Sequence, residues 1–120
     1  MIKYIIFING LYDILCALSI LYLYKFKYLN LFATLHTNVF LDNYKNNLNN
    51  RLLAYWILLY GIIRLFIFID NYYIKFLIFL TYIIEIYAFF NENFIFNTTD
   101  NSKVLFIILS SIIILYFLFL

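Results

Sequence analysis

Four long apolar stretches, separated by polar segments, constrain the fold of this chain more than any other feature. They run over about residues 2–24, 52–69, 74–90 and 104–120. A helix that crosses a bilayer needs about 20 mostly apolar residues. A chain that is 68% hydrophobic and 12% charged also carries more apolar surface than a soluble domain of 120 residues can bury. The sequence therefore predicts an all-α fold, a four-helix transmembrane bundle, as one domain over residues 1–120.

The first apolar stretch is expected to remain in the protein as a membrane span. Lys3 and the segment "ALS" at residues 17–19 are also features of a secretory signal peptide. However, Asn9 and Asp13 interrupt the apolar part, and the apolar run continues past residue 19. Both observations favour a retained helix.

The longest polar connection contains a segment with the periodicity of an amphipathic helix. Within residues 25–51, apolar side chains recur at helical spacing at Tyr28, Leu31, Phe32, Leu35 and Val39. This pattern predicts a short interfacial helix lying on the membrane. His36 falls in this segment, but a metal site or a catalytic pair would need partners, and the chain has no second histidine.

Basic residues are distributed unequally between the two ends of the predicted bundle. The long connection and the segment 91–103 together carry Lys25, Lys27, Lys45, Arg51 and Lys103, whereas the opposite end carries Lys3 and Lys75. Because cytoplasmic segments are enriched in basic residues, the long connection is expected in the cytosol and both termini outside or in the lumen. The sequon that begins at Asn97 would then stay unglycosylated.

Three charged residues lie inside the apolar stretches, where they are costly and are expected to pair. Asp13 falls near the middle of its span, and Arg64 roughly 5 Å away toward the end that holds the N-terminus. The two should meet, with Asn9 adding a hydrogen bond. Glu85 falls on the other side of the midplane, so that Arg64 would reach it only by stretching. Glu85 is expected to be neutral instead, because burial disfavours an ionised carboxylate.

The intramembrane polar residues Asn9, Asp13, Arg64 and Glu85 admit three interpretations. The favoured one is a structural clamp that fixes the register of the helices. A second is a path for protons or ions, although a pathway needs several relay groups along the membrane normal. A third is that one of the charges pairs with a helix of a partner protein.

The chain shows no arrangement of residues typical of catalysis or of cofactor binding. It has no Ser/His/Asp set, no cluster of histidines and no Cys/His ligand spacing, and Cys16 is its only cysteine. Gly10 and Gly61 are its only glycines, too few for a phosphate-binding loop. The sequence therefore predicts a protein that is not an enzyme and binds no cofactor and no metal. The net charge of +2, without a basic tract, also predicts no nucleic-acid partner.

Two segments resemble a known family of small four-helix membrane proteins. Arg51, Trp56 and Arg64 form the pattern R-x4-W-x7-R, which resembles the "ARTFG-x-WT…R" segment of the ergosterol-biosynthesis scaffold family. The stretch "TYIIEIYAFFNENFIFNT" at residues 81–98 looks like that family's "TY-x-IALGHFLSELLIYGT". The chain departs from the family where Ala54-Tyr55 replaces Phe-Gly and where Ala88 replaces a histidine.

The resemblance implies a tether and not a catalyst. Members of the family hold the enzymes of sterol C-4 demethylation together on the membrane of the endoplasmic reticulum. The residues that it marks as interface or fold determinants are Arg51, Trp56, Arg64 and Glu92. It also implies that the partners are the lipid bilayer and other membrane proteins.

Two other functions stay open at this stage. The residues encoded by A/T-rich codons are abundant, as in "NYKNNLNN" at residues 43–50, which is typical of a biased genome. The chain could therefore be a small accessory subunit of a larger complex in an organellar inner membrane or a viral membrane. A small transporter or proton channel that uses Asp13, Arg64 and Glu85 is the remaining alternative.

Overall fold

The computed structural model describes residues 1–21 and 48–119, and the elements found there are helical. They are α1 (Ile2–Leu21), α3 (Leu48–Leu65), the short 3-10 helix η2 (Phe66–Phe68), α4 (Tyr72–Phe94) and α5 (Asn101–Leu118). The four α-helical segments, α3 continuing into η2, are long and apolar enough to cross a membrane. The prediction of an all-α bundle with four spans is confirmed. The predicted interfacial helix lies outside the described residues.

The helices α4 and α5 begin a few residues before the predicted spans because a polar residue caps the first turn of each. Asn71 precedes α4, and its side chain accepts a hydrogen bond from the backbone N–H of Tyr73 at 2.8 Å. Asp100 caps α5 in the same way, accepting from the N–H of Ser102 at 3.1 Å. Such caps satisfy backbone donors that the first helical turn leaves without partners. The apolar stretches predicted the positions of the spans, and the polar caps start α4 and α5 a few residues before those stretches.

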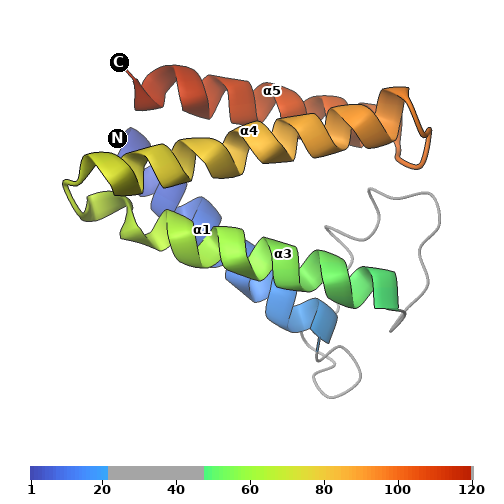
Figure 1. Cartoon of the computed structure of the whole chain (residues 1–120), viewed down its shortest axis with the longest axis horizontal. Coiled ribbons are helices and arrows are strands. Elements are labelled where there is room, and N and C mark those ends of the chain that lie inside the picture. Colours follow the sequence, from blue (N-terminus) through green and yellow to red (C-terminus); the bar gives the residue numbers. More distant parts are fainter. Residues whose placement is uncertain (22–47, 120) are drawn as a thin grey trace.

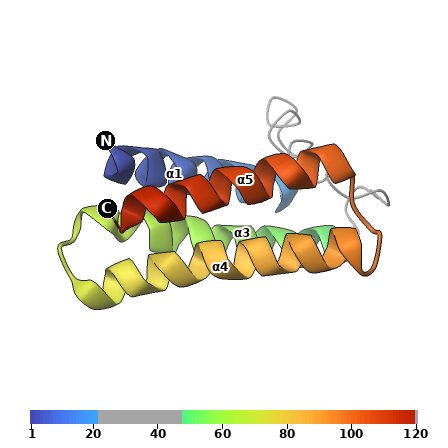
Figure 2. The ribbon, with the colours of Figure 1, turned by 90° about the horizontal axis from the view of Figure 1, so that it is seen from above.

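The helices are arranged as two pairs (Figure 1). α1 packs mainly on α3, and α4 packs mainly on α5. The N-terminus, the C-terminus and the turn between η2 and α4 lie at one end, and the connection between α4 and α5 lies at the other. In Figure 1 the two pairs are closest near the η2–α4 turn and diverge toward the opposite end. Figure 2 shows from above that α1 and α5 lie on one side of the bundle and α3 and α4 on the other.

The pairs are joined by apolar clusters at two levels. Near the η2–α4 turn, all four spans contribute to a core of Ile6, Ile67, Ile78, Tyr82 and Leu118. Toward the other end, Phe89 of α4 packs with Val104 and Ile108 of α5, and Trp56 of α3 borders that cluster. The level between them is where the polar side chains of the bundle gather.

The outward faces of the helices are apolar and exposed. Phe106 is 74% exposed, and α1, α3 and α4 likewise expose many large hydrophobic side chains. An apolar surface of this extent is incompatible with water but is the expected exterior of a membrane-embedded bundle. The protein is therefore an integral membrane protein.

Candidate functional site: a buried charge cluster between the helix pairs

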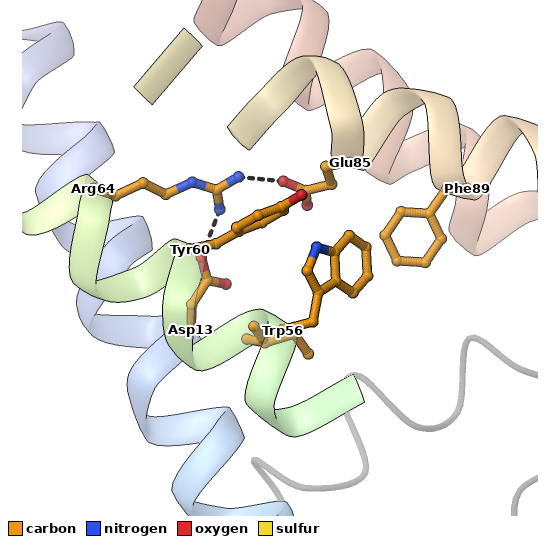
Figure 3. Close-up of a pocket in the computed structure, with 7 residues that line it drawn as sticks. Asp13, Trp56, Tyr60, Arg64, Glu85 and Phe89 are labelled. Atoms are coloured by element: carbon orange, nitrogen blue, oxygen red, sulfur yellow. Dashed lines mark hydrogen bonds and ion pairs between the residues drawn. The ribbon is translucent and has the colours of Figure 1, made fainter. Parts of the chain in front are cut away.

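Arg64 lies at the centre of the bundle and contacts two other helices. Its side chain extends from the last turn of α3 toward α4 and is 1% exposed (Figure 3). Nη1 donates to Oδ2 of Asp13 on α1 at 2.5 Å, and Nη2 donates to Oε2 of Glu85 on α4. Nε donates to the hydroxyl of Thr81, also on α4, at 3.2 Å. The planar guanidinium suits this arrangement because its donors point in several fixed directions.

Aromatic rings flank the guanidinium. The Tyr82 ring lies beneath it, with 3.9 Å between the Arg64 Cζ and the ring centroid, and the Tyr60 ring lies at 5.5 Å. The face of an aromatic ring attracts a cation, and the attraction is strongest where water is excluded. The hydroxyl of Tyr82 accepts a hydrogen bond from the amide of Asn9 on α1 at 2.9 Å. These contacts hold Arg64 between α1 and α4.

Both acids are largely withdrawn from the surface, but not equally. The side chain of Asp13 is 7% exposed and that of Glu85 is 19% exposed. Breaking a buried ion pair on one side strands a charge in a poorly solvating environment, which costs several kcal/mol, of order 3–5. The cluster therefore ties the α1–α3 pair to the α4–α5 pair strongly.

A small pocket adjoins the cluster on the side away from the η2–α4 turn. Its volume is about 20 Å³, enough for about one water molecule. The six residues labelled around it in Figure 3 are Asp13, Trp56, Tyr60, Arg64, Glu85 and Phe89. Trp56 packs on Tyr60 with 5.1 Å between the centroids and on Phe89 at 6.0 Å, so that aromatic side chains form one wall.

The contacts within the intramembrane cluster agree only in part with those predicted from the depth of each residue along its span. Arg64 and Asp13 are in contact, as their positions along the spans indicated. The expectation that Arg64 does not readily reach Glu85 is wrong, because the two form an ion pair. Asn9 reaches the cluster through Tyr82, which was not foreseen.

Thr81, Tyr82 and Tyr60 are partners of Arg64 that sequence reasoning did not assign to the cluster. A usable signal existed for two of them. Thr81 and Tyr82 precede Glu85 by four and three residues, so all three lie on one face of α4. Because tyrosine is frequent throughout the chain, the spacing of Tyr82 from Glu85 did not stand out in the sequence.

The residues marked by the family resemblance fall into two groups. Trp56 and Arg64 belong to the pocket and the cluster. Arg51, in the first turn of α3, and Glu92, in the last turn of α4, lie near the opposite end of the bundle from the η2–α4 turn. There the carboxylate of Glu92 accepts a hydrogen bond from the hydroxyl of Thr98, and its carbonyl accepts from the Thr98 N–H at 3.0 Å.

The rest of the α4–α5 connection is also held by hydrogen bonds. Asn93 donates through its amide to Asn101 at 2.8 Å and accepts from the hydroxyl of Thr99 at 3.1 Å. Asn97 adopts a left-handed backbone conformation, φ 54°, which asparagine tolerates better than most residues. In the part of the chain that the structure describes, no three His, Cys, Asp or Glu side chains are grouped to hold a metal ion.

Within the part of the chain that the structure describes, four helices long and apolar enough to cross a membrane surround a buried charge cluster, which defines the class of this protein, a multi-pass membrane protein. The family described as "Erg28 like protein" matches residues 3–116, nearly the whole chain. The chain therefore belongs to the Erg28-like family, and the suspected resemblance to the ergosterol-biosynthesis scaffold family is confirmed. No curated protein and no solved structure matches the chain.

Proposed function

We propose that this protein is a non-enzymatic scaffold that holds partner proteins, the enzymes of sterol C-4 demethylation, at the membrane of the endoplasmic reticulum. The observation that carries the proposal is the match to the Erg28-like family over residues 3–116. It favours the scaffold over an accessory subunit of an organellar or viral complex and over a proton channel.

The geometry of the interior supports a binding function over a catalytic one. Pockets that hold organic ligands have volumes of several hundred Å³, about 300–1,000 Å³. The pocket beside Arg64 has about 20 Å³, and the polar groups around it are engaged with one another. A sterol or a nucleotide does not fit there. The surfaces that remain for recognition are the outer faces of the helices and their ends.

We assign partner contact to the end of the bundle that carries the α4–α5 connection. Arg51 and Glu92 both lie toward it, and the family resemblance marks both as interface or fold determinants. Hydrogen bonds from Thr98 and Thr99 to Glu92 and Asn93 give the connection a defined shape. A surface that is ordered in advance binds with a smaller entropic cost.

Co-purification from the native membrane in mild detergent tests the proposal. The tagged protein should bring down membrane enzymes that mass spectrometry identifies as sterol C-4 demethylation enzymes. Arg51→Ala with Glu92→Ala should weaken the association. Lys75→Ala, at the opposite end of the bundle, is the matched control and should retain it. Recovery of the protein alone at every detergent strength would contradict the scaffold proposal.

A further inference from the structure

Two exposed tyrosines occupy equivalent positions toward the end of the bundle that carries the α4–α5 connection. Tyr55 of α3 is 54% exposed and Tyr87 of α4 is 68% exposed, so both face the lipid. Tyr55 follows Arg51 by four residues, and Tyr87 precedes Asn91 by four. Each tyrosine therefore lies one helical turn, ~6 Å, inside the polar residue that borders its apolar stretch. The two side chains start at a similar depth in the bilayer.

The two hydroxyl groups are expected to point in opposite directions along the membrane normal. The Cα–Cβ bonds of a helix tilt toward its N-terminus, and long side chains continue in that direction. At this end of the bundle α3 begins and α4 ends, because the two helices run antiparallel. The Tyr55 side chain is thus directed toward the interface, where water and lipid head groups are available. The Tyr87 side chain is directed toward the centre of the bilayer, where they are not.

The Tyr87 hydroxyl has no acceptor in the part of the chain that the structure describes. Asn91, a polar side chain of the same face, lies one turn toward the C-terminus of α4, opposite to the direction in which Tyr87 is expected to point. The hydrocarbon offers no acceptor either, and a polar group without a partner there is unfavourable. The ester groups of the lipids lie in the interfacial region, outside the hydrocarbon core. The hydroxyl therefore calls for an acceptor from another molecule within the bilayer.

We propose that the outer face of α4 around Tyr87 binds a membrane-spanning helix of a partner protein. That helix accepts a hydrogen bond from the Tyr87 hydroxyl through a carboxylate, amide or hydroxyl oxygen. The inference rests on the proposed scaffold function and places part of the partner recognition inside the bilayer. Close packing and hydrogen bonds hold helices together in lipid. The same face offers exposed apolar side chains for that packing, namely Ile83, Ile84, Phe90 and Phe94.

A second copy of this chain would not supply the acceptor. Two copies that pair through this face in one membrane are related by an axis along the membrane normal, which brings residues of equal depth together. One turn toward the N-terminus of α4, where the Tyr87 hydroxyl is expected, the face carries Ile83 and Ile84. Neither side chain accepts a hydrogen bond. The occupant is therefore a different protein whose spanning helix has a polar residue at this depth.

Site-specific photo-crosslinking in the native membrane tests which molecule covers this face. The photoreactive amino acid p-benzoylphenylalanine at Ile83 or Phe90 should form an adduct with a spanning segment of another protein, which peptide mass spectrometry identifies. The same probe at Phe106, an exposed position of α5, is the matched control and should not yield this adduct. Adducts at Ile83 and Phe90 with lipid only, with a second copy only, or with a segment that has no polar side chain would overturn the proposal.

Removal of the hydroxyl alone provides a second test. Tyr87→Phe should raise the apparent Kd for the crosslinked protein in mild detergent about three-fold, and at most about 20-fold, as expected for one hydrogen bond between membrane helices. Tyr55→Phe is the matched control, because it removes a hydroxyl that starts at the same depth but is directed toward the interface. It should leave the Kd unchanged. An unchanged Kd in Tyr87→Phe would overturn the proposal.

These outcomes separate the inference from the scaffold proposal. If Tyr87→Phe recovers the sterol C-4 demethylation enzymes as well as the parent protein does, the scaffold proposal stands and this inference fails. If the parent protein recovers no partner and neither probe captures one, both fail.

Discussion

Gly10 of α1 and Gly61 of α3 face each other at the point where the two helices cross. A Cβ atom at either position would lie 2.8 Å from the carbonyl oxygen of the other glycine. They are the only glycines in the chain. Small residues let helix backbones approach closely within a membrane, where packing and hydrogen bonds hold helices together. The close approach places Asp13, three residues after Gly10, within reach of Arg64, three residues after Gly61.

Gly61→Ala is therefore expected to destabilise the bundle by about 1–3 kcal/mol, the usual cost of overpacking. The new methyl group would meet the Gly10 carbonyl and the side chain of Ile14, each at 2.8 Å, and the backbone there cannot move away without separating the helices. Unfolding in mixed detergent micelles measures the loss. Leu59→Ala, at an exposed position of α3, is the control and should change stability little. Equal stability of the parent and Gly61→Ala would contradict the close crossing.

Removing Arg64 should be more damaging than removing it together with one of its acids. Arg64→Leu removes the buried base that both Asp13 and Glu85 contact and should cost about 3 kcal/mol. Adding Asp13→Leu removes one of the stranded acids, so the double variant should be the more stable of the two. The same unfolding measurement compares them. Losses that simply add would show that Asp13 and Arg64 are not coupled.

Tyr82 has two separable contributions, one from its hydroxyl and one from its ring. Tyr82→Phe removes the acceptor of the Asn9 amide and should cost about 1 kcal/mol, while the ring beneath Arg64 stays. Tyr82→Leu removes the ring as well and should cost about 2 kcal/mol more, because a desolvated cation–π contact is lost. If the two variants were equally stable, the ring would have no particular role in holding Arg64.

Asp100 should make the start of α5 sensitive to acid. The hydrogen bond from the Ser102 hydroxyl lowers the pKa of Asp100 below its usual value, and the backbone N–H groups of Ser102 and Lys103 and the charge of Lys103 act in the same direction. A group with a lowered pKa stabilises the folded state at pH above its unfolded value and loses that contribution as the pH falls through the folded value. The protection of the Ser102 and Lys103 amides against hydrogen exchange, measured relative to the intrinsic exchange rate at each pH, should therefore decrease in acid. In Asp100→Asn, which keeps a capping oxygen, this acid dependence should disappear.

The sequence allowed the fold to be predicted but only part of the site, for separable physical reasons. The spans were predictable because the bilayer requires a fixed length of apolar helix, and composition alone reveals that length. The contact of Arg64 with Asp13 followed from their similar depths. The contact with Glu85 did not, because a depth calculated along straight, untilted helices ignores how the helices lean and how far an arginine side chain extends. Tyr82 was missed because tyrosine is frequent throughout the chain, so that no single position stood out.

The orientation in the membrane is the last prediction. The distribution of basic residues predicts that the α4–α5 connection lies in the cytosol, so Asn97 should carry no glycan although Asn97, Thr98 and Thr99 form a sequon. Because the Thr99 hydroxyl is buried and bound to Asn93, an unmodified Asn97 alone would not prove the orientation. A flexible tag with its own sequon ahead of Met1 provides the control, and it should be glycosylated if the N-terminus is lumenal. A glycan on Asn97 together with an unmodified tag would show that the orientation is reversed.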